Sequence, residues 1–240
     1  MDDHADVAIV GAGAAGLMAG IWAGRTDPRR RIVCLDGAEQ LGAKILIAGG
    51  GRCNVTHDAV SEAAFAGSSR NAIKKVLRRF DVPETIAFFA ELGVELKREE
   101  TGKLFPVTDQ ARTVLEALLR RARESAVVLQ HPWRVESIAH AGDGFVLAGP
   151  QGRLVARAVV LATGGRSVAK TGSDGHGYVL AEALGHSIVP TLPALVPLLL
   201  PADHVLITLR GISADVRLEL RSATGKRLVQ MDGSLLCTHR

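Results

Sequence analysis

The sequence predicts an α/β fold with a central parallel sheet, and three observations support this prediction. The apolar run at residues 7–10 has the length and β-branched content of a buried parallel strand. It leads into a glycine turn at residues 11–16 and then into an apolar helical segment at 17–23. A second apolar run, residues 32–35, ends at an acidic residue, Asp36. This order of strand, glycine turn, helix and strand predicts a Rossmann-like domain.

The glycine turn has the spacing G-x-G-x-x-G, and each glycine has a physical role. Gly11 allows the tight turn, Gly13 lets a pyrophosphate approach the backbone, and Gly16 lets helix and strand pack closely. The free N–H groups at the start of the helix would hold the phosphate charge. Asp36 lies 20 residues beyond Gly16, where a carboxylate binds ribose hydroxyls and repels a 2′-phosphate. The pattern favours FAD or NAD over NADP; the alternative is a flexible turn followed by a surface aspartate.

Composition indicates an ordinary globular chain. With 47% hydrophobic and 22% charged residues and a net charge of +4, the 240 residues can bury a core. Short arginine clusters and only 4% aromatic residues argue against a nucleic-acid partner. The three cysteines and eight histidines show no metal-ligand spacing, so no metal site is predicted. Without a recognisable signal peptide or membrane-spanning run, we expect a cytoplasmic protein with reduced thiols, and its oligomeric state stays open.

A second glycine-rich run follows the second strand. It contains Lys44 and then the sequence GGGRCN at residues 49–54. Three consecutive glycines lose much backbone entropy on folding, a cost that is tolerated where the backbone passes close to a flat or bulky group. Lys44 and Arg52 can supply positive charge there to a pyrophosphate or a flavin edge. The alternative is a mobile surface loop.

The middle of the chain, about residues 59–125, is predicted to be a mostly helical insertion. One helix is expected at 71–80, and a second opens at Pro83 and closes at Gly93. A small hairpin is expected over 94–104. Thr108 and Asp109 can cap a further helix at 111–124.

A short strand at 127–130 is predicted to join the parallel sheet, followed by a β-meander at about 133–157. A buried strand from residue 158 then ends in Ala-Thr-Gly-Gly at 162–165, where small residues let a dinucleotide pass close by. Asp174 and His176 begin a helix over 176–184; a capping carboxylate and a surface histidine are favoured over substrate contacts. After a proline-rich crossover, strands at 206–209, 215–220 and 227–231 start a β-rich second domain. The expected domains are 1–192 and 193–240.

Five motifs then give a specific resemblance. GAGAAGLMAG, GAKILIAGGGRCNVTH, GKLFPVTDQA, LATGGRSVAKTGSDGHGYVLAEALGH and PALVPL occur in this order. Together they resemble the BaiN/YhiN-type flavoproteins, FAD-dependent oxidoreductases of which some carry the name aminoacetone oxidase. The resemblance extends from residue 5 to the end of the chain. It implies FAD in an extended pose across a glutathione-reductase-type Rossmann domain.

The resemblance also implies where FAD lies. The glycine turn would meet the pyrophosphate, Asp36 the ribose, the backbone at Val135 the adenine edge, and the GGGRCN loop the flavin. The cofactor residues expected are Gly11, Gly13, Ala14, Ala15, Gly16, Asp36, Gly37, Lys44, Gly51, Arg52, Cys53, Asn54, Val135, Ala162, Thr163 and Gly164. No catalytic side chain is assigned.

Members of this family are usually longer than this chain. They complete the second domain and return to the Rossmann domain with a last glycine-rich segment. This chain stops at residues 237–240, so we expect half of the substrate domain and the final flavin-binding segment to be missing. It is expected to be a fragment or a truncated product.

The expected function is an FAD-dependent oxidoreductase, an NAD(P)H-linked reductase or an oxidase, that transfers hydride at flavin N5 to or from a small organic substrate. Cys53 lacks a CxxC partner, so packing is favoured over a redox role. The alternatives are a non-catalytic FAD- or nucleotide-binding fragment and an NAD-dependent dehydrogenase. GGGRCN and the Ala-Thr-Gly-Gly strand count against the dehydrogenase, which needs neither.

Overall fold

The computed structural model describes residues 3–65, 69–193, 197–209 and 211–238. Internal contacts divide the chain into two compact units, Met1–Ile188 and Val189–Arg240. The first unit contains the central sheet, and the second contains a hairpin and a short 3₁₀ turn. Among the described residues, no helix combines the length and the apolar character that crossing a bilayer requires.

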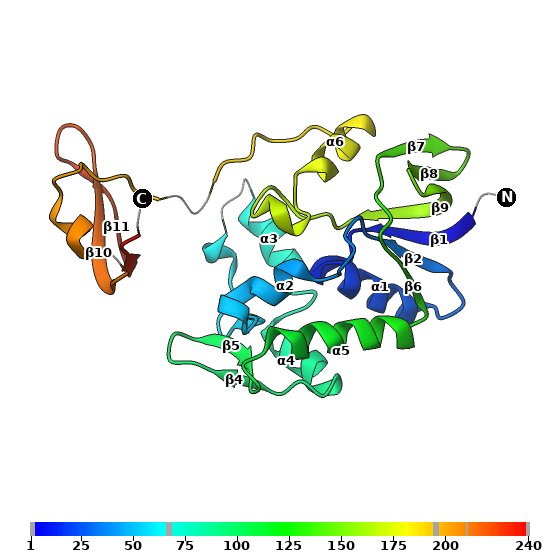
Figure 1. The fold of residues 1–240 in the computed structure, drawn as a ribbon, viewed down its shortest axis with the longest axis horizontal. Helices are drawn as coiled ribbons and strands as arrows, with labels where there is room; N and C mark the ends of the chain where they lie inside the picture. Colours follow the sequence, from blue (N-terminus) through cyan, green and yellow to red (C-terminus); the bar gives the residue numbers. More distant parts are fainter. Residues whose placement is uncertain (1–2, 66–68, 194–196, 210, 239–240) are drawn as a thin grey trace. The chain divides into compact units, whose positions relative to one another are not determined.

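A six-stranded sheet forms the centre of the first unit (Figure 1). Its strands, in spatial order, are β6 (Val127–Gln130), β2 (Ile32–Leu35), β1 (Asp3–Val10), β9 (Gly152–Leu161), β8 (Gly144–Gly149) and β7 (Ser137–Ala141). The first four pair in parallel, and the last two continue the sheet as an antiparallel meander. The predicted α/β fold with a central parallel sheet and a β-meander is confirmed.

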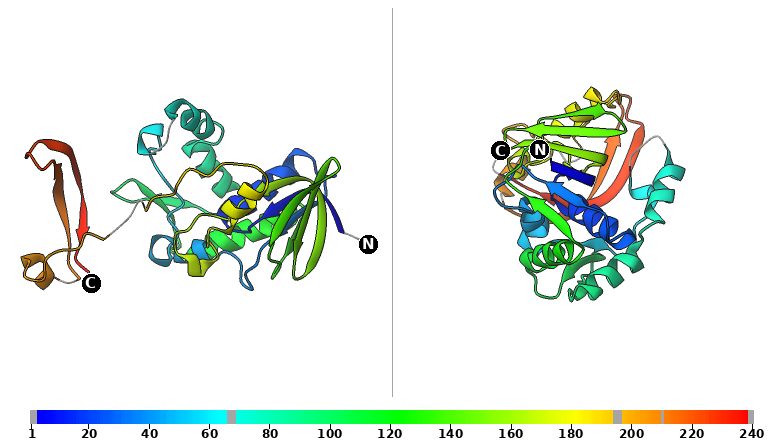
Figure 2. Two further views of the ribbon diagram at one scale, coloured as in Figure 1. Left: turned by 90° about the horizontal axis from the view of Figure 1, so that it is seen from above. Right: turned by 90° about the vertical axis from the view of Figure 1, so that its right-hand side faces the viewer.

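Helices cover both faces of this sheet (Figure 2). The helices α1 (Ala14–Thr26) and α5 (Ala111–Glu124) pack against each other on one face, whereas α6 (His176–Ala183) lies on the other. Successive strand residues point to opposite faces, so Ile9 joins the core under α1, while Ala8 and Val10 join the core under α6. Because both faces are buried there, residues 7–10 of β1 and 32–35 of β2 are continuously apolar.

The segment between β2 and β6 combines helices with a small antiparallel sheet. Its helices are α2 (Ala43–Ile47), α3 (Arg70–Leu77), α4 (Val82–Glu91) and α5, and its strands are β3 (Thr56–His57), β4 (Leu96–Arg98) and β5 (Lys103–Pro106), in the order β3-β5-β4. A capping box of Asp81 and Glu84 begins α4, and Gly93, with φ +76°, follows its end. The predicted second helix and hairpin are therefore confirmed.

The strand β9 is a single continuous element, where the sequence predicts a meander strand followed by a separate buried strand. Its first part pairs antiparallel with β8, and from Leu154 to Leu161 it runs parallel to β1. Val160 and Leu161 are each 37% exposed, so the prediction that this end is buried is wrong. Arg153 and Arg157 interrupt the apolar pattern, which hides the continuity of the strand in the sequence.

The predicted cap of α5 is also wrong. The helix begins after Gln110, and no side chain caps its N-terminus. The Thr108 hydroxyl bonds to the Thr113 hydroxyl at 2.8 Å, and the Asp109 carboxylate pairs with Lys97. A charge-assisted bond to a lysine is stronger than a bond to a neutral backbone N–H, so the ion pair takes the carboxylate away from the helix.

The second unit consists of a 3₁₀ turn at Val205–Leu209 and the antiparallel hairpin of β10 (Ser213–Arg221) and β11 (Arg227–Leu236). The two predicted strands of the hairpin are confirmed, but the strand predicted at 206–209 is wrong. The Thr208 hydroxyl donates to the Val205 carbonyl at 2.7 Å, and the Leu206 N–H donates to the His204 ring at 3.2 Å. These local bonds compete with strand pairing.

Candidate functional site

A cavity of about 1070 Å³ lies at the carboxyl ends of β1, β2 and β9 in the first unit. Open α/β sheets bind their ligands at this edge. Most of the predicted cofactor residues line its wall, namely Gly11, Gly13, Ala14, Ala15, Asp36, Gly37, Lys44, Cys53, Asn54, Val135, Ala162, Thr163 and Gly164. Gly16, Gly51 and Arg52 are not among the lining residues. That these residues contact FAD stays a prediction.

The three glycines of the first turn occupy three different environments. Gly11 has φ +103°, and a Cβ there would lie 2.6 Å from the Ala162 carbonyl oxygen. A Cβ on Gly16 would lie 1.7 Å from the Gly11 carbonyl oxygen, so this glycine allows the helix to approach the turn. A Cβ on Gly13 would meet nothing within 4 Å. Gly13 therefore leaves open space in the cavity wall, while the other two serve the packing of the backbone.

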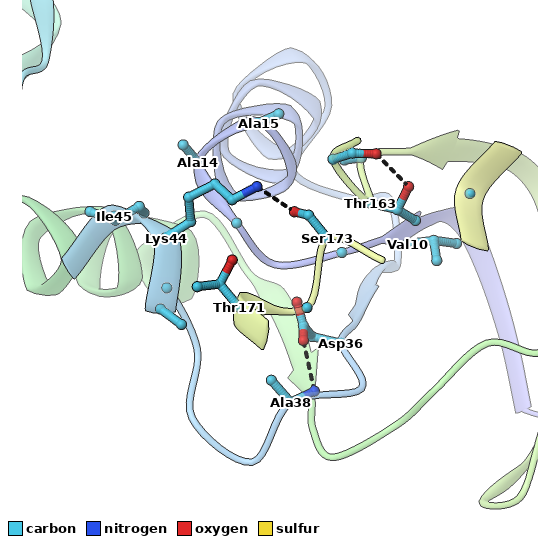
Figure 3. Close-up of a pocket in the computed structure, with 18 of the residues that line it drawn as sticks. Val10, Ala14, Ala15, Asp36, Ala38, Lys44, Ile45, Thr163, Thr171 and Ser173 are labelled. Carbon is cyan, nitrogen blue, oxygen red and sulfur yellow. Dashed lines mark hydrogen bonds between the residues drawn. The ribbon is translucent and has the colours of Figure 1, made fainter. Parts of the chain in front are cut away.

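The Asp36 carboxylate connects the end of β2 to the glycine turn. One oxygen accepts a hydrogen bond from the Ala12 N–H at 2.6 Å. The other accepts one from the Ala38 N–H at 2.8 Å, which Figure 3 shows. These bonds fix the carboxylate at the cavity wall beside the start of α1. Each carboxylate oxygen has a second lone pair, so both can still accept a hydrogen bond from a ligand hydroxyl.

Lys44 spans the cavity from α2 to the segment after β9. Its ammonium donates to the Ser173 hydroxyl at 2.7 Å, as Figure 3 shows. It also donates to the Ser167 carbonyl at 2.8 Å. Within the described parts of the chain, no carboxylate lies within ion-pair distance of this ammonium. The positive charge of Lys44 is therefore available to an anionic ligand.

The GGGRCN loop forms another part of the wall, and its arginine points elsewhere. Cys53 and Asn54 line the cavity, and Gly49, Gly50 and Gly51 all have positive φ angles. The Arg52 guanidinium pairs with Glu99 and stacks 4.0 Å above the centre of the Phe105 ring. The end of the loop thus lies at the cavity wall, whereas the charged guanidinium of Arg52 lies away from the cavity, against Glu99 and Phe105.

Sequence reasoning missed Trp133, Arg134 and Ser173, which also line the cavity. Arg134 directly precedes Val135, the predicted adenine contact. This neighbouring position is the feature of the sequence that could have indicated Arg134 as a cavity residue. Asp174 accepts a hydrogen bond from the His176 N–H at 3.0 Å and pairs with Arg134 at 2.7 Å, which together lower the pKa of the Asp174 carboxyl. The first of these bonds satisfies the N–H at the first residue of α6, but the N-cap residue itself is Gly175, which makes no side-chain cap bond. Both Asp174 and His176 nevertheless line the cavity.

All three cysteines, Cys34, Cys53 and Cys237, are free thiols. Burial raises the pKa of the Cys34 thiol to about 12, and the Asp36 carboxylate adds to this rise. Burial also raises the pKa of the Cys53 thiol. Both thiols are therefore neutral at pH 7 and behave as small apolar groups. No group of three potential metal ligands occurs in the parts of the chain that the structure covers.

Alkylation with iodoacetamide at pH 7 is expected to label Cys237 and to leave Cys34 and Cys53 unmodified in the folded protein. Cys237 is only half-buried. A pKa of about 12 lowers the thiolate fraction of Cys34 on the order of a thousandfold relative to an exposed thiol. Mass spectrometry of the labelled protein measures this. The Cys237→Ser variant is the control, and labelling of that variant without unfolding would contradict the buried positions.

Sequence comparison identifies close relatives. The model of the HI0933-like protein Rossmann domain matches residues 5–235. The chain is 37% identical over 211 residues to the 3-dehydro-bile acid delta(4,6)-reductase of Clostridium scindens, which covers 88% of this chain and 51% of that protein. It is 31% identical over 237 residues to the ribosomal RNA dihydrouridine synthase of Escherichia coli, a match that covers 98% of this chain and 57% of that protein. The chain thus spans about half the length of these curated relatives.

Two solved structures share the fold. The 3-ketosteroid-delta4-(5alpha)-dehydrogenase from Rhodococcus jostii has a TM-score of 0.57 at 18% identity, covering 78% of this chain and 55% of that chain. THI4 from Thermovibrio ammonificans has a TM-score of 0.50 at 19% identity, and the match covers 77% of this chain and 64% of that chain. At these identities the two structures show the fold alone. The family match and the curated relatives confirm the resemblance: the chain belongs to the HI0933-like family, the BaiN/YhiN-type FAD-dependent oxidoreductases that its motifs predict.

Proposed function

We propose that this chain binds FAD and forms the cofactor-binding part of an oxidoreductase that acts on a small organic substrate. One observation carries the proposal. The start of α1 opens onto the cavity at Gly13, where the backbone leaves free space, and the Asp36 carboxylate is fixed beside it. A glycine turn next to a fixed carboxylate suits an adenosine diphosphate group, which FAD contains.

The residues of the cavity wall fit this cofactor. The free N–H groups of Ala14 and Ala15 at the start of α1 would hold the pyrophosphate. Asp36 would accept hydrogen bonds from the ribose, and the backbone at Val135 would meet the adenine edge. Lys44, whose charge has no carboxylate partner in the described part of the chain, would neutralise part of the negative charge.

Bound FAD would supply two-electron transfer as hydride at flavin N5. The residues of this chain would orient the cofactor and exclude water from it. The apolar side chains of Val10, Leu35 and Leu161 line the cavity at the strand ends. Lys44 would keep a positive charge near the flavin while its bonds to Ser167 and Ser173 close that side of the cavity.

The finer parts of the proposal are an NAD(P)H-linked reductase or oxidase, a small-molecule substrate and a cytoplasmic location. The relative with 37% identity is named a reductase of a bile acid, and the relative with 31% identity is named for ribosomal RNA. We favour a small molecule because the first is the more similar relative and the chain is poor in aromatic residues. Binding of an RNA oligonucleotide at physiological salt would contradict this choice.

Titration of the purified chain with FAD tests the proposal directly. We expect a saturable appearance of the visible bands of bound oxidised flavin, and a chain that takes up no FAD would overturn the proposal. Binding of NAD in place of FAD would favour the alternative of an NAD-dependent dehydrogenase. Anaerobic mixing of the FAD-loaded chain with NADH or NADPH then separates an active flavoenzyme, whose visible absorption is lost, from the alternative of a non-catalytic FAD-binding fragment.

Substitution of Asp36 by alanine is expected to weaken FAD binding by about tenfold or more, because hydrogen bonds from hydroxyls to a charged acceptor contribute about 1.5–3 kcal/mol each. The variant also loses the bonds to the Ala12 and Ala38 N–H groups, so its melting temperature should fall. Equilibrium titration and thermal melting measure the two effects. Asp143→Ala, at the exposed turn between β7 and β8, is the control and should bind FAD like the parent.

A further inference from the structure

The loop over residues 48–54 is a strained part of the cavity wall. Gly49, Gly50 and Gly51 have φ angles of +55°, +69° and +89°, and Cys53, which has a side chain, has φ +64°. For a residue with a Cβ, this left-handed conformation costs about 1–2 kcal/mol. Such backbone persists only when the surrounding structure holds it in place.

Contacts with β5 hold the two ends of the loop. A Cβ on Gly49 would lie 2.7 Å from the Phe105 ring, so the backbone at Gly49 packs directly against this buried aromatic residue. The Val55 N–H donates to the Leu104 carbonyl at 2.9 Å. The ends are therefore fixed, whereas a Cβ on Gly50 would meet nothing within 4 Å and a Cβ on Gly51 would meet only the Leu46 carbonyl oxygen, at 3.9 Å.

Arg52 supplies the anchor for the middle of the loop. Its guanidinium lies 4.0 Å from the centre of the Phe105 ring and donates a hydrogen bond to Glu99. The same guanidinium lies 3.7 Å from one carboxylate oxygen of Asp109. This oxygen is buried and accepts no hydrogen bond from any residue the structure describes. Arg52 is therefore the cation beside this oxygen, while Lys97 pairs with the other oxygen of the half-exposed Asp109 carboxylate.

We infer that Arg52 is a positioning residue for the flavin end of the cavity. Its stacking on Phe105 and its ion pairs with Glu99 and Asp109 hold the loop so that Cys53 and Asn54 face the cavity. The inference rests on the proposed FAD function and goes beyond it, because Arg52 acts through the loop and not by contact with the cofactor. The adenosine end of the cavity is built from β1, β2 and the segment at 133–135, which Arg52 does not touch.

Comparison of two ligands tests this division of the cavity. FAD occupies both ends, whereas ADP occupies only the adenosine end. We expect Arg52→Met, which keeps an apolar chain over Phe105 but removes the charge, to bind FAD about tenfold more weakly than the parent and ADP within about twofold. Arg52→Lys restores a charge without the planar fork and should recover part of the FAD affinity.

Arg98→Met is the matched control. Arg98 lies in β4, next to Glu99, and its ion pair is with Asp58, outside the 48–54 loop. Its removal should leave the affinities for both ligands unchanged. If Arg52→Met unfolds, Glu99→Gln weakens the same anchor more gently and should reduce FAD affinity without a change in ADP affinity.

The outcomes separate this inference from the proposed function. A parent chain that binds neither FAD nor ADP would overturn the proposed function itself. A parent that binds FAD, with an Arg52→Met variant that loses FAD and ADP affinity equally, would show a general loss of the fold and overturn the inference. Unchanged FAD affinity in folded Arg52→Met would overturn it as well.

Discussion

Replacement of Gly13 by valine is expected to abolish measurable FAD binding while the fold stays intact. A Cβ at this position meets no protein atom within 4 Å, so the valine methyl groups would project into the cavity and not into the core. They would occupy the space that a pyrophosphate needs beside the start of α1. We expect a loss of at least about a hundredfold in FAD affinity, which corresponds to ~2.7 kcal/mol.

The free energy of unfolding should change little in this variant. Gly13 has an extended backbone with φ −76°, which valine adopts readily, and a poorer N-cap residue costs about 1 kcal/mol. Gly233 in β11 is the matched control, since a Cβ there also meets nothing within 4 Å. Titration with FAD and denaturant unfolding of Gly13→Val and Gly233→Val give both quantities. A Gly13→Val variant that binds FAD as the parent does would show that the diphosphate does not pass this point.

Replacement of Gly16 by alanine is expected to reduce the stability of the fold severely, whereas replacement of Gly13 should leave stability almost unchanged. The added Cβ would lie 1.7 Å from the Gly11 carbonyl oxygen and 2.9 Å from its carbon. Backbone atoms on both sides cannot yield as a flexible side chain can, so the start of α1 must move away from the turn. We expect a destabilisation of about 4 kcal/mol or more, a magnitude that is exceptional for a single substitution.

Gly20→Ala in the same helix is the control for this prediction. There the added Cβ meets side-chain atoms and no backbone, namely the Val127 methyl groups at 3.1 and 3.2 Å and the Ile9 Cδ1 at 3.4 Å. Alanine also favours the helix by about 1 kcal/mol. Chemical denaturation monitored by circular dichroism compares the two variants. An unfolding midpoint of Gly16→Ala equal to that of Gly20→Ala would contradict the close approach of helix and turn.

The parts of the fold that the sequence predicted are those specified by short, local patterns. The strand, glycine turn and helix at the N-terminus, the carboxylate at Asp36 and the helix from Pro83 to Gly93 each depend on residues close together in the chain. The meander was predictable for the same reason, because its strands are separated only by tight turns. The site predictions near these elements accordingly fall on the cavity wall.

The parts that were missed depend on contacts between distant residues. The sequence around Arg52 contains nothing that indicates Glu99, 47 positions away, as the partner of its charge. In the same way, Asp109 pairs with Lys97 instead of capping the next helix. The prediction of a strand at 206–209 was wrong because of local bonds and not because of distant contacts. Hydrogen bonds of the Thr208 hydroxyl and the His204 ring to nearby backbone groups outweighed the strand-favouring composition of this segment.

The continuity of β9 limits where this chain can tolerate a change in length. One strand connects the meander to the small residues at 162–164, and a shift by one position would turn every side chain of β9 to the opposite face. We therefore expect insertions in this region to be tolerated best at the turns at either end of β8. Loops grafted at those turns would leave the nucleotide edge of the sheet undisturbed, which makes them suitable attachment points for labels or fused domains.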